Sequence, residues 1–114
     1  MKTIYHRNAA WWGDSTVIVI DGGNALVKVS RDKRLPPDCA YISDLMVLNS
    51  ERDKRLGNRL LKLAEEEAVY MGANHAMLDC DSTGFIPEWY KRHRYKVYKK
   101  EDNRLFLIKN LQYL

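Results

Sequence analysis

The sequence has few of the features that mark secreted, membrane-spanning or metal-binding chains. It contains only two cysteines among 114 residues, Cys39 and Cys80, and these lack the close spacing of a zinc or redox motif. No pattern typical of a signal peptide precedes them, so we expect reduced thiols and a cytoplasmic location. The longest apolar runs, such as residues 17–20, are far shorter than the roughly 20 residues that cross a membrane. We therefore expect neither a membrane segment nor a bound metal.

The sequence also has little glycine and proline, and its net charge is small. Six glycines and three prolines form no linker or low-complexity segment, and the sequence shows no internal repeat. The net charge of +4 is compatible with an anionic ligand but is too small by itself to indicate nucleic-acid binding. With 46% hydrophobic and 30% charged residues, the composition is that of a single globular domain covering residues 1–114.

The first half of the chain predicts mainly strands. Residues 1–13 contain two adjacent tryptophans but no clear period, and we expect an N-terminal arm or a short helix there. Residues 14–21 and 25–30 flank a Gly-Gly-Asn turn, which predicts a hairpin because these turn residues tolerate positive φ. After a proline-containing loop, residues 39–49 predict a third strand that is apolar enough to be central.

A long helix is predicted from near Arg52 to a capping glycine at Gly72. Leucines and alanines recur there at helical spacing, with Lys62 and the acidic residues 65–67 largely off the apolar stripe.

The rest of the chain predicts a strand, a short helix and a closing hairpin. Residues 74–81 predict the strand, and residues 84–94 the short helix, which Pro87 opens. Residues 95–111 predict the hairpin. The resulting order, β-β-β-α-β-α-β-β, implies an α/β (α+β) fold with a mixed sheet and a right-handed parallel crossover at its centre.

The start of the long helix has two explanations. Ser50 and Asp53 are spaced as a capping box, which needs no ligand. Four basic residues nevertheless crowd the same place: Arg52, Lys54, Arg55 and Arg59. Cations are unfavourable at the positive end of a helix dipole unless an anion neutralises them, and free N–H groups after a central strand form a phosphate site. The spacing alone leaves both explanations open.

Two segments resemble the signature motifs of the GNAT superfamily of acyl-CoA N-acyltransferases. The first is ISDLMVLNSERDKRLGNRLL, residues 42–61, in which residues 52–57 match the phosphate loop Arg/Gln-x-x-Gly-x-Gly/Ala. The second, residues 89–95, matches the family's Phe-Tyr followed after a few residues by Gly-Phe. Arg55 and Arg94 stand where the family usually has glycine. Thirteen N-terminal residues are also too few for the two helices that usually follow the family's first strand.

The resemblance implies a GNAT-like mixed central β-sheet with a splayed parallel strand pair. It also implies an enzyme that transfers an acetyl group from acetyl-CoA to a primary amine by direct attack through a tetrahedral intermediate. Acetyl-CoA is then the co-substrate, and no metal is implied. Coenzyme contacts are implied for the backbone of Met46 and Val47, for Thr83, and for the phosphate loop with the helix start. That last group comprises Arg52, Asp53, Lys54, Arg55, Leu56, Gly57 and Asn58.

Two further residues match positions that carry the family's chemistry, and Asp81 is a candidate because of its place on a strand face. Tyr90 falls on the general-acid tyrosine, which would protonate the coenzyme A thiolate, and simple aromatic packing is the alternative. Asp44 falls on the acidic position beside the splay, as a base acting through water or as a structural hydrogen-bond acceptor. Asp81 shares a strand face with Asp79 and would receive a cationic amine, with solvation at a strand edge as the alternative.

Two other functions remain open at this point. A GNAT-like protein that binds acyl-CoA without catalysis would explain Arg55, Arg94 and the short N-terminus. Residues 89–100 interleave aromatic and basic side chains, as in small nucleic-acid-binding modules, although residues 95–100 alternate like a lysine-guarded edge strand. We expect acetyl-CoA and an amine acceptor as partners, with no nucleic acid and no membrane. A second copy of the chain is a further candidate, because a homodimer would supply the missing wall of the acceptor site.

Overall fold

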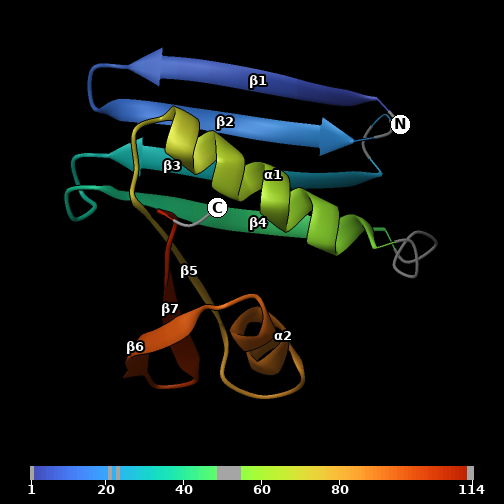
Figure 1. The fold of residues 1–114 in the computed structure, drawn as a ribbon, viewed down its shortest axis with the longest axis vertical. Coiled ribbons are helices and arrows are strands. Elements are labelled where there is room, and N and C mark those ends of the chain that lie inside the picture. Colours follow the sequence, from blue (N-terminus) through green and yellow to red (C-terminus); the bar gives the residue numbers. More distant parts are fainter. Residues whose placement is uncertain (1, 21, 23, 49–54, 113–114) are drawn as a thin grey trace.

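The computed structural model describes residues 2–20, 22, 24–48 and 55–112 (Figure 1). They form a seven-stranded sheet in the order β1-β2-β3-β4-β5-β7-β6, with two helices. The strands are β1 (Thr3–Ala10), β2 (Gly13–Ile20), β3 (Ala25–Asp32), β4 (Cys39–Val47), β5 (His75–Asp81), β6 (Lys96–Glu101) and β7 (Arg104–Asn110). The helices are α1 (Leu56–Tyr70) and α2 (Ile86–Arg92).

The first strand corrects an expectation from the sequence. Residues 1–13 were expected to form an arm or a short helix, but β1 pairs antiparallel with β2 along its whole length. Six of its eight residues are exposed, so the segment lacks the alternation that normally reveals a strand. Trp11 and Trp12 lie in the turn before β2 and are 81% and 54% exposed. The sheet therefore has one more strand at its N-terminal edge than the sequence predicted.

The predicted hairpin and helix form the core. Alternate residues of β2 and β3, such as Ile18 and Val27, are fully buried and face α1, which lies across these strands in Figure 1. α1 begins at Leu56 rather than near Arg52, because Arg55 adopts a left-handed conformation (φ 59°) that a continuous helix excludes. Gly72 has the positive φ expected of the capping glycine.

The capping box proposed for the helix start lies outside the described residues. Within the described part, Arg55 is the residue that precedes the first turn of α1, and its side chain makes no capping hydrogen bond.

The splayed parallel pair is confirmed. β4 and β5 pair only from Cys39↔His75 to Tyr41↔Met77, and no further pairs join them beyond this point in the described chain. On its other side β4 carries a bulge, where the register with β3 shifts and Asp44 takes a positive φ of 56°. The bulge and the lost pairing leave the end of β4 directed away from β5.

The C-terminal elements follow the prediction. α2 begins with Ile86 and has Pro87 in its first turn, and β6 and β7 form the closing hairpin. β7 lies between β5 and β6 in the sheet. α2 and the β6–β7 hairpin therefore lie on the far side of the splay from α1, as Figure 1 shows.

Candidate functional site

A cavity of about 690 Å³ lies where β4 parts from β5. We call it the splay cavity. Its lining comes from the end of β4, the start of α1 and the helix α2: Leu45, Met46, Val47, Arg55, Gly57, Asn58, Phe85, Ile86, Trp89 and Tyr90. Three segments that are distant in the sequence thus line one cavity.

The strand wall of the cavity offers backbone groups. Met46 pairs with Leu26 of β3, but neither Met46 nor Val47 has a pairing partner in the described part of β5. The Met46 side chain is 60% exposed, while Leu45 and Val47 pack against the core. The peptide groups here can therefore bond a ligand that lies along the strand, as a missing neighbour strand would.

The helix wall offers N–H groups. Arg59 N–H donates to the carbonyl of Arg55 at 3.1 Å, so the N–H groups of Leu56, Gly57 and Asn58 have no acceptor within the helix. A Cβ at Gly57 would lie 3.7 Å from Trp89 Cζ2, so the indole packs close to this first turn. The arrangement is suited to a phosphate, because N–H groups without an acceptor in the helix and the helix dipole both favour negative charge.

The α2 wall places a partly buried tyrosine at the cavity. Tyr90 lies edge to face with Trp89 at 5.0 Å between ring centroids and with Tyr95 at 5.7 Å. Burial raises the pKa of Tyr90 to about 12, and the nearby Cys80 and Asp79 add to the shift. The phenol therefore stays protonated at neutral pH and can act as a proton donor.

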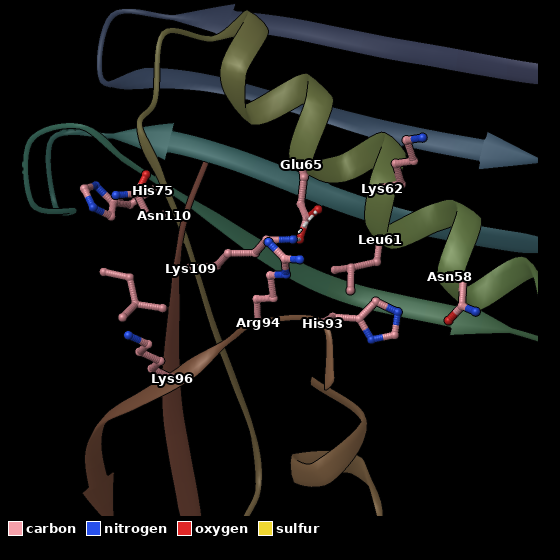
Figure 2. Close-up of a pocket in the computed structure, with 11 residues that line it drawn as sticks. Asn58, Leu61, Lys62, Glu65, His75, His93, Arg94, Lys96, Lys109 and Asn110 are labelled. Atoms are coloured by element: carbon pink, nitrogen blue, oxygen red, sulfur yellow. Dashed lines mark hydrogen bonds and ion pairs between the residues drawn. The ribbon is translucent and has the colours of Figure 1, made fainter. Parts of the chain in front are cut away.

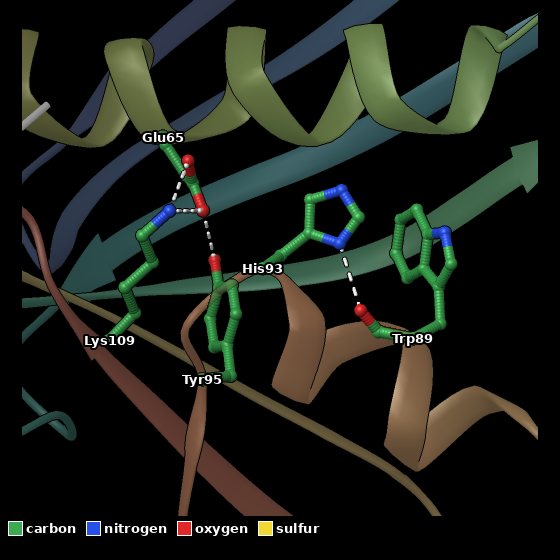
Figure 3. A network of polar contacts seen from close by, with 5 residues as sticks. All are labelled: Glu65, Trp89, His93, Tyr95 and Lys109. Carbon is green, nitrogen blue, oxygen red and sulfur yellow. Dashed lines mark hydrogen bonds and ion pairs between the residues drawn. The ribbon is translucent and has the colours of Figure 1, made fainter.

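A buried polar network lies behind this tyrosine (Figure 3). The Tyr95 hydroxyl donates to Glu65 at 2.7 Å, and the Lys109 ammonium donates to both Glu65 oxygens at 3.0 Å. In the same view, His93 Nδ1 donates to the Trp89 carbonyl at 2.8 Å. Burial raises the pKa of Tyr95 above its usual value, and the charge of Glu65 reinforces the shift. The network joins α1 to the turn after α2 and to β7.

Sequence reasoning missed this network. Residues 65–67 were expected to lie off the apolar stripe, yet Glu65 and Glu67 are 4% and 3% exposed. Glu67 accepts hydrogen bonds from Arg7 of β1 at 2.8 and 2.9 Å and from Thr16 of β2 at 2.7 Å. Both acids point inward because each finds donors on strands that are distant in the sequence.

The splay cavity unites several residues implied by the resemblance. Six of them line it: Met46, Val47, Arg55, Gly57, Asn58 and Tyr90. The Leu56 side chain is 2% exposed in the core, so only its backbone faces the site. Arg52, Asp53 and Lys54 lie outside the described residues. The apolar lining from Phe85, Ile86 and Trp89 was not anticipated, although such residues at the start of a short helix could have signalled it.

The polar candidates Asp44, Asp79, Asp81 and Thr83 lie outside the cavity lining. Asp44 is exposed on the bulge, next to the lining residue Leu45. Asp81 accepts hydrogen bonds from the Thr83 N–H at 2.9 Å and hydroxyl at 2.8 Å, and these bonds lower the pKa of Asp81. Asp79 forms an ion pair with Arg104, whose Nη2 lies 2.6 Å from Asp79 Oδ2. The structure therefore brings Asp81 and Thr83 together in one turn.

The described residues 2–20, 22, 24–48 and 55–112 contain neither of two other kinds of site. Among these residues, no group of three or more histidine, cysteine, aspartate or glutamate side chains is arranged to hold a metal ion. None of the helices in this part of the chain is long and apolar enough to cross a membrane.

Comparison with known proteins identifies relatives of this architecture. A family model described as the acetyltransferase (GNAT) family matches residues 5–87. An acetyltransferase from Bacillus cereus is 28% identical with a TM-score of 0.67, and the match covers 84% of this chain and 71% of that one. A PaiA N-acetyltransferase from Thermoplasma acidophilum, in complex with coenzyme A, is 15% identical with a TM-score of 0.68 and coverages of 84% and 59%. An aminoglycoside 6′-N-acetyltransferase complexed with coenzyme A is 15% identical with a TM-score of 0.68, and the match covers 85% of this chain and 73% of that one. No curated protein sequence matches the chain significantly.

Proposed function

The chain belongs to the GNAT family of acetyltransferases, and we propose that it transfers an acetyl group from acetyl-CoA to a primary amine. The observation that carries the proposal is the splay cavity. It combines strand backbone that lacks a partner on the β5 side, a helix start whose first N–H groups have no acceptor within the helix, and a protonated, partly buried tyrosine. These are the groups needed to hold a thioester, bind its phosphates and protonate its leaving thiolate.

The proposed coenzyme position follows the walls of the cavity. The pantetheine arm would lie along the backbone of Met46 and Val47, as a strand would, with Thr83 as a further contact. The pyrophosphate would accept hydrogen bonds from the N–H groups of Leu56, Gly57 and Asn58. Arg55 would add its guanidinium to a phosphate oxygen. Arg52, Asp53 and Lys54 remain in the proposal as the preceding part of the phosphate loop.

The proposed reaction is direct attack of a neutral amine on the thioester carbonyl. A C–N bond forms, and the resulting oxyanion is stabilised by a backbone N–H of the β4 segment. Collapse of this tetrahedral intermediate breaks the C–S bond, and Tyr90 donates its proton to the coenzyme A thiolate. The proton that the amine loses passes through water to Asp44. The apolar side chains of Phe85, Ile86 and Trp89 reduce the access of bulk water to the thioester.

The acceptor side of the proposal involves Asp81. Both hydrogen bonds from Thr83 reach Oδ1 of Asp81, so Oδ2 is available to a cationic amine approaching the site. Only the turn at Trp11 and Trp12 connects β1 and β2, so no longer segment covers the sheet there. We include a homodimer in the proposal, because a second copy of the chain would supply one wall of the acceptor site. If the protein sediments as a strict monomer at micromolar concentration, the homodimer is excluded.

The test combines binding with turnover. Calorimetric titration with acetyl-CoA and coenzyme A measures the dissociation constant, and release of free thiol during incubation with a panel of primary amines measures transfer. We expect saturable binding of both ligands and amine-dependent thiol release. Binding without release for any amine would leave acyl-CoA binding as the function. Absence of binding at millimolar coenzyme would overturn the proposal.

A further inference from the structure

One row of apolar side chains crosses four neighbouring strands of the sheet. The strand register places Ile4 of β1 opposite Val19 of β2, and Val19 opposite Leu26 of β3. Leu26 in turn lies opposite Met46 of β4. Residues directly opposite one another in antiparallel strands point to the same face of a sheet, so these four side chains form one line. We call it the apolar row, and at about 4.8 Å between strands it is about 14 Å long.

Strand alternation places the apolar row on the sheet face opposite α1. Ile18 and Val27 are fully buried in the core beneath α1, so their neighbours Val19 and Leu26 point the other way (Figure 1). Val19 and Leu26 lie on strands with a neighbour on each side, yet both are only half-buried, and Met46 is 60% exposed. Both described helices pack on the core at the opposite side. In the described part of the chain, the face that carries the row is therefore left without a covering helix.

The apolar row ends at the splay cavity. Met46 is both the last member of the row and a lining residue of that cavity. Across the splay, Leu78 and Cys80 of β5 belong to the buried core, so by alternation Asp81 lies on the same face as the row. A ligand amine that enters the cavity from this face therefore meets a carboxylate beside it and an apolar surface behind it.

The row is separate from a second cavity, of about 820 Å³, between α1 and the corner formed by the end of α2, β6 and β7 (Figure 2). The described lining of the second cavity contains no residue of β1–β4. That cavity adjoins the splay cavity at Asn58 in the helix wall, whereas the row reaches it at Met46 in the strand wall. The row therefore gives the splay cavity an approach of its own.

A cation lies beside the apolar row. Lys28 is two residues from Leu26 on β3, so it points to the same face, about 7 Å along the strand. It forms no ion pair with any residue that the structure describes, and His6 lies in the same cross-strand row. Asp32, the acid farther along β3 on this face, is paired with Arg34 at 2.8 Å. The charge of the face therefore favours a ligand that carries an anion beside its apolar body.

We propose that the apolar row binds the body of the amine acceptor, and that this acceptor is a primary amine on an apolar body that carries a carboxylate. The inference rests on the proposed function, because it assigns the acceptor of that reaction. The amine would lie at the splay cavity beside Asp81, the apolar body on Leu26 and Val19, and the carboxylate within reach of Lys28. A polycationic amine would meet Lys28 and an apolar surface, so this face disfavours it.

The first experiment measures acceptor binding without the coenzyme, so its outcome does not depend on transfer. Calorimetric titration compares 4-(4-aminobutyl)benzoate with 4-phenylbutylamine, which lacks the carboxylate, and with putrescine, which lacks the apolar body. We expect the wild type to bind the benzoate about threefold more tightly than 4-phenylbutylamine, and 4-phenylbutylamine more than about tenfold more tightly than putrescine. Equal binding of 4-phenylbutylamine and putrescine, or binding of neither, would overturn the proposal.

Variants then locate the binding surface. Leu26→Thr should weaken binding of 4-phenylbutylamine by about tenfold and Val19→Thr by about threefold, because both remove apolar surface while keeping a residue that favours strands. Leu26→Met keeps the apolar surface and should bind within about twofold of wild type, which separates lost contact from lost folding. Lys28→Gln should weaken only the carboxylated ligand, by about threefold.

The matched controls lie on β6, away from the row. Val97→Thr and Lys100→Gln make the same chemical changes there and should alter binding by less than about twofold. Unchanged binding in Leu26→Thr and Val19→Thr, or an equal loss in Val97→Thr, would overturn the proposal. Sedimentation of a dimer that Leu26→Thr dissociates would also overturn it, because a second copy of the chain would then cover the row.

Turnover distinguishes this inference from the proposed function. With acetyl-CoA present, kcat/KM for thiol release should follow the same order of amines and fall by about the same factor in Leu26→Thr. Binding that depends on the row without any thiol release would overturn the proposed function and leave the row as an amine-binding surface. Thiol release that is equal for putrescine and 4-phenylbutylamine, and unchanged in Leu26→Thr, would overturn this inference alone.

Discussion

Tyr95 donates its hydroxyl to Glu65 across 2.7 Å and so joins the turn after α2 to the middle of α1. The ring of Tyr95 also lies edge to face with Tyr90, the proposed general acid, at 5.7 Å between centroids. The buried pair therefore supports the wall of the splay cavity from behind. Its contribution to folding and the roles of the cavity residues can be tested separately.

Replacing Tyr95 by phenylalanine should destabilise the fold while keeping the aromatic ring. Glu65 would retain Lys109 but lose its hydroxyl donor, and such a loss at a buried charged acceptor costs about 1–3 kcal/mol. Urea denaturation followed by circular dichroism measures the free energy of unfolding. Tyr98→Phe, at a residue 44% exposed on β6, is the control. Equal stability of the two variants would show that the Tyr95–Glu65 bond contributes nothing.

Glu67 should make stability depend on pH in the acidic range. Hydrogen bonds from Arg7, and secondarily from Thr16, hold the pKa of Glu67 below its unfolded value of 4.5 despite burial. A folded-state pKa below the unfolded one stabilises the fold above the unfolded value, and this stabilisation is lost as pH falls through the folded value. We expect wild type to exceed Glu67→Gln in unfolding free energy at pH 7, with the gap narrowing below about pH 4. A gap that stays constant between pH 7 and pH 3 would contradict this.

Gly57 should tolerate a methyl group but not a long side chain. A Cβ there would make an ordinary 3.7 Å contact with Trp89, and alanine favours a helix over glycine by about 0.5–1 kcal/mol. Gly57→Ala should therefore be at least as stable as wild type and still bind coenzyme A. Gly57→Met should fold, but its affinity for coenzyme A should fall by about tenfold or more, because the methionine side chain would enter the splay cavity. Equal coenzyme affinity for both variants in calorimetry would place the coenzyme elsewhere.

Tyr90→Phe should lower kcat by about 100-fold with little change in coenzyme affinity, as for loss of a general acid. Because burial raises the pKa of Tyr90 to about 12, the wild-type rate should show no alkaline decline from this group below pH 10. Initial rates between pH 6 and pH 10 measure both effects, with Tyr98→Phe as the control. A kcat within twofold of wild type would remove Tyr90 from the mechanism.

Asp44→Asn should distinguish between two roles of Asp44: acceptor of the amine proton, or a residue that only shapes the bulge. Asparagine tolerates the left-handed φ of 56° but cannot accept the proton of the attacking amine. We expect kcat to fall by about tenfold to 100-fold with unchanged unfolding free energy. Asp44→Gly, which also tolerates this φ, should lose activity to the same degree. Full activity in Asp44→Asn would leave Asp44 with a purely structural role.

Local patterns in the sequence determined much of this protein. The turn between β2 and β3, the apolar stripe of α1 and the closing hairpin depend on contacts between near neighbours, so their period is visible in the chain. The two signature segments indicated the splay between β4 and β5 and most of the residues that meet there. β1 was missed because its exposed residues leave no alternation to read.

Only the tertiary structure decided the polar interior and the shape of the cavities. Glu65 and Glu67 look like solvent-facing helix residues until Lys109 and Arg7, 44 and 60 positions away, supply their donors. The same holds for the second cavity, of about 820 Å³, because its lining combines Lys62 of α1 with Lys96 of β6. Periodicity records which face of an element is apolar, whereas the burial of a charge depends on partners that chain folding brings from elsewhere.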